Sequence, residues 1–525
     1  MKNLIFNKKV FNLFLIIYFL IGLILSINVG ITHDESHGLF VWELNKYKLS
    51  NYFLRTNYDV SELDTYHSYY GVGFYLFADT FGKLINLIPE NLGLLDKSNE
   101  LLSKHPSVFI FFILSALYFK KIIYLITRDK IFSNLATVFY LVYPYLLGHS
   151  FFNFKDIPFM SIWLVCTYQF IRILQIYHKK REINNIRLLL LSFLTAYLFS
   201  IRVSGILVFL EYIIFSTFFL RVFNYNFIGL VKEIYVKKLF FLLTFLFFLY
   251  LLHPSFWSNP YKFIYAIEFM SQHIQSVCTV TLGECMKAQN LPSSYIPIWL
   301  FFKLPIIIIF GFILFPFYEK KIFLLKNNIF LIGSLLLTIL SITFLLIILN
   351  VNLYDELRQI IFIFPLILIC SLSIIYFFSK KISYILVFIF SIYFLIQNIK
   401  IFPYNYLWLN NLTHFTKING VFELDYWGVS TKRVSDYLVK QNINDKICIL
   451  SNRSDAIKAF NHNKSLCLKS LSELHKKNKR PFYVFLGERA LKKGVPNNCK
   501  ISFSEHINLN FSKEKLILAN VFFCD

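Results

Sequence analysis

The sequence predicts an α-helical polytopic membrane protein with a small external α/β domain at its C-terminus. Of its 525 residues 57% are hydrophobic, whereas roughly 45–50% is usual for soluble globular proteins. The mean hydropathy is +0.57, and long Ile, Leu and Phe runs carry the excess. Only 16% of the residues are charged. Disordered and fibrous classes are therefore excluded.

The apolar runs divide into eleven predicted membrane spans. A helix needs about 20 mostly apolar residues to cross the hydrocarbon core of a bilayer. The stretch 188–220 is divided at Arg202, because only two helices there keep the later loops on consistent sides. The spans lie near 11–30, 105–119, 131–147, 157–177, 188–201, 203–220, 239–252, 297–317, 329–349, 359–377 and 382–399.

The loops between the spans differ strongly in charge. Six of the segments, taken together, hold 20 Lys/Arg and 4 Asp/Glu, and cytoplasmic loops concentrate basic residues. We therefore expect a cytoplasmic N-terminus and an external C-terminus. The net charge of +23 then reflects orientation, and no nucleic-acid partner is predicted. The basic segments are 1–10, 120–130, 178–187, 221–238, 318–328 and 378–381.

Two external regions are long enough to fold. The first, 31–104, belongs to a predicted transmembrane domain over 1–399, and its stretch 69–87 is expected to form an interfacial helix. The second is the tail, 400–525. Short β-prone runs alternate there with polar helical stretches, which predicts a separate α/β domain.

The eight cysteines fit this topology, because none is expected to face the cytosol. Cys166 and Cys370 lie within spans, and the other six are external. Up to three disulfides are compatible with an oxidising compartment, although buried free thiols are an alternative for the tail. The external cysteines are Cys278, Cys285, Cys448, Cys467, Cys499 and Cys524.

Polar residues are concentrated at the predicted external ends of the spans. Charged groups beside apolar spans are costly and therefore indicate function. The cluster consists of His33, Asp34, Glu35, His149, Asn153, Lys155, Asp156, Arg202, His253, Trp257, Asp355, Glu356 and Arg358. Glu211, inside the sixth predicted span, has no predicted partner.

The carboxylates of the cluster suggest proton transfer or cation binding. Two neighbouring acids such as Asp34 and Glu35 can supply a general base, a divalent-cation site or both, although acidic pairs also occur at ordinary helix ends. Asp156 precedes Pro158, which suits the first turn of a helix whose dipole stabilises a carboxylate.

The cations of the cluster suggest phosphate binding at the membrane surface. Arg202 and Arg358 present guanidinium groups that match phosphate oxygens, and Lys155 can face an anionic headgroup. Snorkelling is the alternative for Arg202, and a salt bridge to Asp355 or Glu356 for Arg358. There is no glycine-rich phosphate loop and no HExxH motif, so no nucleotide-linked donor is predicted, and a divalent cation at the acidic pair is the one cofactor that the sequence leaves open.

Several motifs together resemble the GT-C superfamily of glycosyltransferases. They are a first span that ends in Thr32-His33-Asp34-Glu35, the loop pattern His149-x-x-x-Asn153-x-Lys155-Asp156-x-Pro158, Tyr69-Tyr70-Gly71, Leu357-Arg358 and Phe422-Glu423-Leu424-Asp425-Tyr426-Trp427-Gly428. More narrowly, residues 1–435 look like the group that includes protein O-mannosyltransferases and lipid A aminoarabinose transferases. The Tyr66-His67-Ser68 segment differs from many relatives, so the resemblance does not carry over the sugar or the acceptor.

The resemblance implies a hexosyl or pentosyl transferase that uses a polyprenyl-phosphate-linked sugar. The acceptor would be a lipid, polysaccharide or protein on the external face of a bacterial inner membrane, or in the endoplasmic reticulum of a eukaryote. Asp34 matches the catalytic base, and Asp156 a second acidic residue in the site, beside Glu35. Lys155, Arg202 and Arg358 would bind the donor phosphate, and His33, His149, Asn153, Tyr69 and His253 would line the cavity.

The alternative class is a lipid or sugar transporter or flippase. Such proteins carry polar residues in both membrane halves, or a midplane site between paired interrupted helices. Here the polar cluster lies at one boundary, and the sequence shows no internal repeat.

Overall fold

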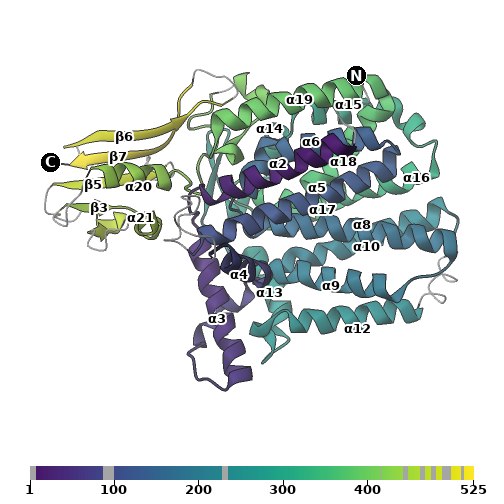
Figure 1. Cartoon of the computed structure of the whole chain (residues 1–525), viewed down its shortest axis with the longest axis horizontal. Helices are drawn as coiled ribbons and strands as arrows, with labels where there is room; N and C mark the ends of the chain where they lie inside the picture. The colour runs from purple at the N-terminus through teal and green to yellow at the C-terminus, as the bar shows by residue number, and fades with distance from the viewer. Residues whose placement is uncertain are drawn as a thin grey trace.

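The computed structural model describes residues 8–86, 100–226, 235–415, 417–441, 447–460, 467–473, 481–487, 498–509 and 514–524. Most helices run side by side in one bundle, and a small sheet that includes the end of the chain lies at one end of it (Figure 1). The predicted fold class, a helical polytopic protein with a small α/β tail, is confirmed at this level.

The helices of the bundle follow the predicted spans. They are α2 (Lys8–Ile27), α5 (His105–Thr127), α6 (Lys130–Val142), α7 (Pro144–Ser150), α8 (Asp156–Lys180), α9 (Asn185–Ile201), α10 (Leu207–Val222), α12 (Tyr235–Leu251), α14 (Tyr295–Lys303), α15 (Ile306–Ile322), α16 (Lys326–Asn328), α17 (Ser334–Ile348), α18 (Phe364–Phe378) and α19 (Lys380–Ile401). Short 3-10 helices η5 (Val203–Ile206) and η9 (Arg358–Ile363) precede α10 and α18.

Each of the eleven predicted spans overlaps a helix, but the spans differ in length and shape. Among the described residues, seven helices are long and apolar enough to cross a membrane, and two bent pairs raise this number to nine. The pair α6 and α7 bends by 64° at Pro144, and α14 and α15 bend by 113° at Pro305. Proline lacks the N–H that would continue the helix, which accounts for both breaks. Helices α9 and α12, each 17 residues long, occupy the fifth and seventh positions.

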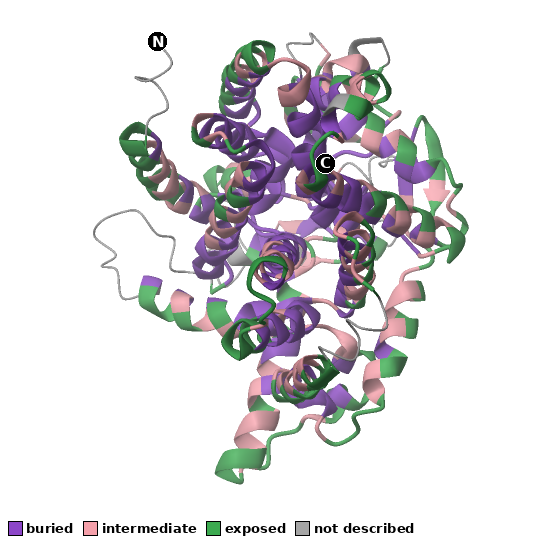
Figure 2. Cartoon of the chain, turned by 90° about the vertical axis from the view of Figure 1, so that its right-hand side faces the viewer, coloured by how far each residue is buried: buried purple, intermediate pink, exposed green. Residues whose placement is uncertain are grey.

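Burial separates inner from outer helices. Helix α18 is buried on nearly every side, whereas α2 and α12 expose large apolar side chains along their length. Figure 2 shows the same contrast, with mostly purple ribbon at the centre of the bundle and green ribbon at its rim. An exposed apolar face of this size is suited to lipid rather than water. The bundle is therefore built to lie in a membrane.

The region 31–104, which was predicted to be external, is more helical than expected. It contains α3 (Glu35–Leu54), η1 (Ser61–Asp64), η2 (Tyr66–Tyr69) and α4 (Gly73–Asn86). Helix α4 lies within the predicted interfacial helix, while α3 was not expected. Gly71 lies between η2 and α4. Only glycine fits at this position, because a side chain there would overlap the backbone of Ile201 at the end of α9.

The chain between α12 and α14 forms a helix and a hairpin. Helix α13 (Lys262–Gln272) leads to the antiparallel strands β1 (Cys278–Thr281) and β2 (Glu284–Lys287). A disulfide between Cys278 and Cys285 closes the hairpin. Two further disulfides, Cys448–Cys467 and Cys499–Cys524, lie in the tail, and Cys166 and Cys370 are free and buried.

The tail contains the predicted α/β unit. Its five-stranded sheet has the order β4-β3-β5-β7-β6, in which β3 is parallel to β4 and β5, and β7 is antiparallel to β5 and β6. Residues 404–409 and 422–429, in contrast, pack in the main core of the bundle. The elements are α20 (Thr431–Lys440), α21 (Ser454–Phe460), β3 (Cys448–Leu450), β4 (Leu468–Lys469), β5 (Phe482–Gly487), β6 (Cys499–Ile507) and β7 (Leu516–Cys524). The division at residue 399 stays a prediction.

Candidate functional site

A cavity of about 250 Å³ lies among the helix ends that carry the predicted polar cluster. It is bounded by the start of α3, η2, the residue before α8, η5, α13, the end of α17 and η9. Six predicted site residues line it, although they are far apart in the sequence. They are Asp34, Tyr69, Lys155, Asp156, Arg202 and Arg358.

Asp34 and Arg358 form an ion pair across the cavity. Nη1 of Arg358 donates to Oδ2 of Asp34 at 3.0 Å, and the Asp34 side chain keeps 27% of its surface exposed. Burial alone would raise the pKa of Asp34, but the charges of Arg358 and Lys155 outweigh it and hold the pKa below its usual range. Asp34 is therefore an ionised carboxylate that remains accessible from the cavity.

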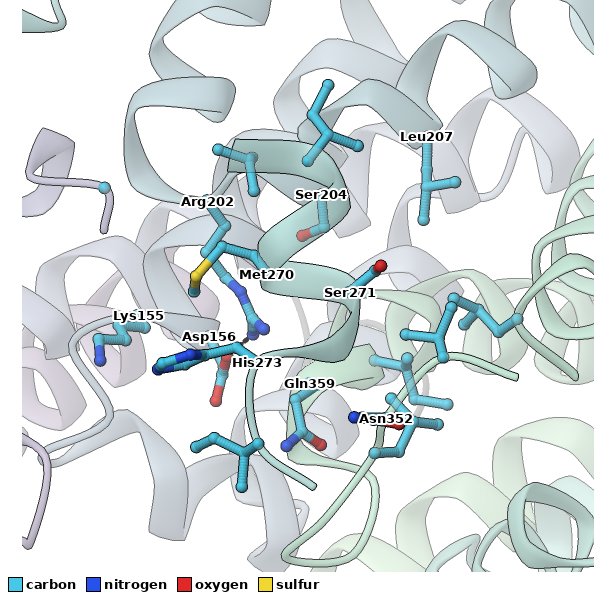
Figure 3. A pocket seen from close by; sticks show the side chains of 18 of the residues that line it. Lys155, Asp156, Arg202, Ser204, Leu207, Met270, Ser271, His273, Asn352 and Gln359 are labelled. Carbon is cyan, nitrogen blue, oxygen red and sulfur yellow. Dashed lines mark hydrogen bonds and ion pairs between the residues drawn. The ribbon is translucent and has the colours of Figure 1, made fainter. Parts of the chain in front are cut away.

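Asp156 begins α8 and forms an ion pair with Arg202, as Figure 3 shows. The side chain of Asn153 donates to the carboxylate of Asp156 at 2.9 Å and accepts from its backbone N–H at 2.9 Å. The second nitrogen contact of this amide is with Nδ1 of His149, at 3.0 Å. His149 and Asn153 are fully buried and lie outside the cavity lining. They orient Asp156 from behind, which corrects their prediction as cavity-lining residues.

Of the three cations that line the cavity, Lys155 is the one without an ion pair to a carboxylate among the described residues. Its ammonium lies over the rings of Tyr70 and Phe154 at 4.9 and 5.0 Å. Burial lowers the pKa of Lys155, whereas the nearby carboxylates of Asp34 and Asp156 raise it. This ammonium is positioned to meet an anion in the cavity.

A strained turn holds Arg358. The two residues Asp355 and Glu356 both have positive φ, 56° and 64°, a backbone region that costs non-glycine residues free energy. Asp355 accepts from Nη2 of Arg358 at 3.0 Å, so the predicted salt bridge is present in addition to the contact with Asp34. The guanidinium also lies over the rings of Tyr354 and Trp427, at 4.9 and 4.4 Å.

A buried ion pair fixes the turn at Asp355 and Glu356 on the side that faces the core. Nζ of Lys303 lies 2.7 Å from Oε2 of Glu356, and both side chains are at most 1% exposed. The hydroxyl of Tyr295 donates to the Glu356 carbonyl at 2.9 Å, and the Asp355 N–H donates to the Thr279 hydroxyl at 2.9 Å. Burial raises the pKa of Glu356 to about 7, against the lowering effect of Lys303. These contacts hold a strained backbone in place.

Glu35 does not reach the cavity. Its Oε1 accepts from the backbone and the hydroxyl of Thr32, at 2.7 and 2.6 Å, and its Oε2 lies 2.7 Å from Nε2 of the buried His105. The prediction of Glu35 as a site residue or cation ligand with Asp34 is therefore not supported by its placement. In the described residues, no group of three or more His, Cys, Asp or Glu is arranged to hold a metal ion.

Two predicted lining histidines also lie elsewhere. His253 is buried beside α12 and stacks on Phe256, with Nδ1 at 2.9 Å from the Leu249 carbonyl. His33 is exposed, and its backbone N–H donates to the Trp427 carbonyl at 3.2 Å. Neither lines the cavity.

Glu211 has a partner that the sequence analysis did not identify. The indole N–H of Trp163 on α8 donates to Oε2 of Glu211 on α10 at 2.6 Å, and both side chains are fully buried. This contact joins two helices inside the bundle and takes no part in the cavity.

Several other residues of the cavity were not predicted as site residues, although Tyr70 belongs to the motif Tyr69-Tyr70-Gly71. Tyr70 and His273 meet at 2.8 Å across 203 positions of the chain, and neutral Asn352 and Gln359 had no chemistry that singled them out. The apolar part of the wall is equally unmarked, because its residues belong to ordinary spans and helices. It is formed by Val203, Leu207, Met270, Leu345 and Leu349, among others.

No family model matches the sequence, and no curated protein matches it either. Among solved structures, the chain is similar to ArnT from Cupriavidus metallidurans bound to undecaprenyl phosphate, with 9% identity and a TM-score of 0.46. The match covers 98% of both chains. The apo form of the same protein gives 10% identity and the same TM-score, over 98% of this chain and 97% of that one.

Proposed function

We propose that this protein is a membrane glycosyltransferase that moves a sugar from a polyprenyl-phosphate carrier to an acceptor. The observation that carries the proposal is one cavity in which an accessible ionised carboxylate, Asp34, faces three cations beside an apolar wall. Lys155, Arg202 and Arg358 suit the phosphate of such a donor. The wall between η5, α13 and α17 suits its hydrocarbon chain.

The reaction follows from this arrangement. Asp34 accepts the proton of the acceptor hydroxyl while that oxygen forms a bond to the anomeric carbon of the sugar. The bond from the anomeric carbon to the phosphate oxygen breaks, and its electron pair leaves with the polyprenyl phosphate. The cations stabilise the charge that grows on this phosphate, which needs no proton donor of its own.

Donor binding would rearrange the ion pairs of the cavity. Arg358 forms an ion pair with Asp34, and Arg202 forms one with Asp156, so both guanidinium groups are held at the cavity before the donor arrives. Donor phosphate would compete with Asp34 for Arg358 and release the carboxylate toward the acceptor. Asp156, at the N-terminus of α8, would keep Arg202 in place during this exchange.

The test is release of undecaprenyl phosphate by the purified protein. The protein is reconstituted in liposomes with undecaprenyl phosphate linked to radiolabelled glucose, mannose or galactose, together with a solubilised cell-envelope extract as the source of acceptor. A transferase moves the label to a water-soluble or distinct lipid product and releases the carrier. A flippase moves the intact donor between leaflets without breaking the bond to the sugar, and that outcome would refute the proposal.

A further inference from the structure

The cavity wall carries three neutral side chains whose buried polar atoms have no hydrogen-bond partner among the described residues. They are Ser204 through its hydroxyl, Asn352 through Oδ1, and Gln359 through both Oε1 and Nε2. Figure 3 labels all three around the cavity, with Gln359 between Asp156 and Asn352 in that view. They come from three separate elements: η5, the loop after α17, and η9.

An unpartnered buried polar atom costs about 1–3 kcal/mol, so its presence calls for an explanation. One such atom is weak evidence, because Gln397 in α19 also has an unpartnered amide and lies outside the cavity. Three such side chains on the wall of one cavity are stronger evidence for a missing ligand than one isolated amide. Asn352 is also fixed in place, since its backbone N–H and its Nδ2 donate to the carbonyls of Ser271 and Gln272, both at 3.0 Å.

These side chains line the same cavity as the cations assigned to the donor phosphate, and two of them are close to those cations in the sequence. Gln359 follows Arg358 in η9, and Ser204 lies two positions after Arg202. In the proposed donor, the sugar is bonded directly to the phosphate. A phosphate held by the two guanidinium groups would therefore place its sugar next to this neutral part of the wall.

The chemistry of the three groups matches an uncharged sugar. A carboxamide offers one acceptor and two donor hydrogens side by side, which can pair with two neighbouring hydroxyl groups. The Asn352 oxygen adds an acceptor, and the Ser204 hydroxyl can donate or accept. We propose that Ser204, Asn352 and Gln359 form the subsite that binds the donor sugar, through neighbouring neutral hydroxyls. This inference rests on the proposed function.

The test separates binding of the sugar from binding of the phosphate. Affinities are measured for bare undecaprenyl phosphate and for the same carrier linked to glucose, mannose or galactose, which together present the common arrangements of neighbouring hydroxyls. The wild-type protein should bind at least one linked form more tightly than the bare carrier. Gln359→Leu should weaken that binding about tenfold, because the amide contacts are lost, and should leave bare-carrier affinity unchanged.

Two further variants keep the result interpretable. Gln397→Leu makes the same change at a buried amide outside the cavity and should alter neither affinity. Ser204→Ala, the smaller change, should show the same selective loss if Gln359→Leu fails to fold.

The possible failures are distinguishable. Equal affinity of wild-type protein for all four carriers would overturn the subsite, as would equal losses for bare and linked carrier in Gln359→Leu. Failure of the wild-type protein to bind bare undecaprenyl phosphate would instead overturn the proposed function.

Discussion

Replacing Asp34 with asparagine should separate sugar transfer from donor binding. The substitution keeps the size of the side chain and removes the charge that lies 3.0 Å from Arg358. A general base accelerates a reaction by about 10²- to 10⁴-fold, so we expect the rate of sugar transfer to fall by at least about 100-fold in Asp34→Asn. The fall should appear in kcat.

Binding of the leaving group should change in the opposite direction. A carboxylate and a phosphate about 5 Å apart repel by about 3 kcal/mol at an effective dielectric constant near 20. The surrounding cations Lys155 and Arg202 reduce this repulsion. We therefore expect Asp34→Asn to bind undecaprenyl phosphate about tenfold more tightly than the wild-type protein, because Arg358 loses its competing anion.

The assay combines carrier release with equilibrium binding of undecaprenyl phosphate, on protein of equal thermal stability. Asp64→Asn is the matched control, since this residue lies in the same region 31–104, outside the cavity lining and with its side chain 83% exposed, and it should change neither quantity. Wild-type transfer by Asp34→Asn would show that another group is the base. Weaker phosphate binding by this variant would show that Arg358 does not hold the phosphate.

Four further outcomes test the surroundings of the site. Glu356→Gln leaves Lys303 buried without its counter-ion and should destabilise the protein by about 3 kcal/mol; an unchanged melting temperature would contradict this role. Cys285→Ser opens the hairpin that presents Thr279 to the strained turn, and it should weaken undecaprenyl phosphate binding by several-fold, whereas equal binding would separate the hairpin from the site. Glu35→Gln should lower thermal stability but transfer sugar faster than Asp34→Asn does, because Glu35 binds His105 in the core. A transfer rate as low as that of Asp34→Asn would show that Glu35 takes part in the reaction. Because the pKa of Asp34 lies below its usual range, wild-type transfer should persist at about pH 5, and a fall in transfer between pH 7 and pH 5 that is absent from Asp34→Asn would show that this pKa is not lowered.

The positions of the helices could be predicted because the lipid bilayer restricts which backbone structures can cross it. Apolar runs long enough to cross a bilayer have few alternatives to a helix, and every predicted span overlaps one. The bends were missed at Pro144 and Pro305, where each break was included in a single span. A proline marks where a helix can break, but the packing around it decides the angle.

The site could be predicted in part for a similar reason. Charges next to apolar spans are costly, so Asp34, Asp156, Arg202 and Arg358 were identifiable, and the structure places all four on one cavity. Glu35 was wrongly placed with them. Successive residues of a helix point about 100° apart. Glu35 therefore turns away from the cavity that Asp34 lines, toward the core, where His105 binds it.

The sequence by itself determined that the chain is a helical membrane protein, which loops carry the basic charge, and which charged residues gather at one set of span ends. These are consequences of hydrophobicity and charge, which act locally along the chain. Only the tertiary structure decided which charges pair, how Lys303 and Glu356 support the turn of Arg358, and that neutral Gln359 and Asn352 face the cavity. Those contacts join distant segments, and a neutral side chain gains its role from what the fold places beside it.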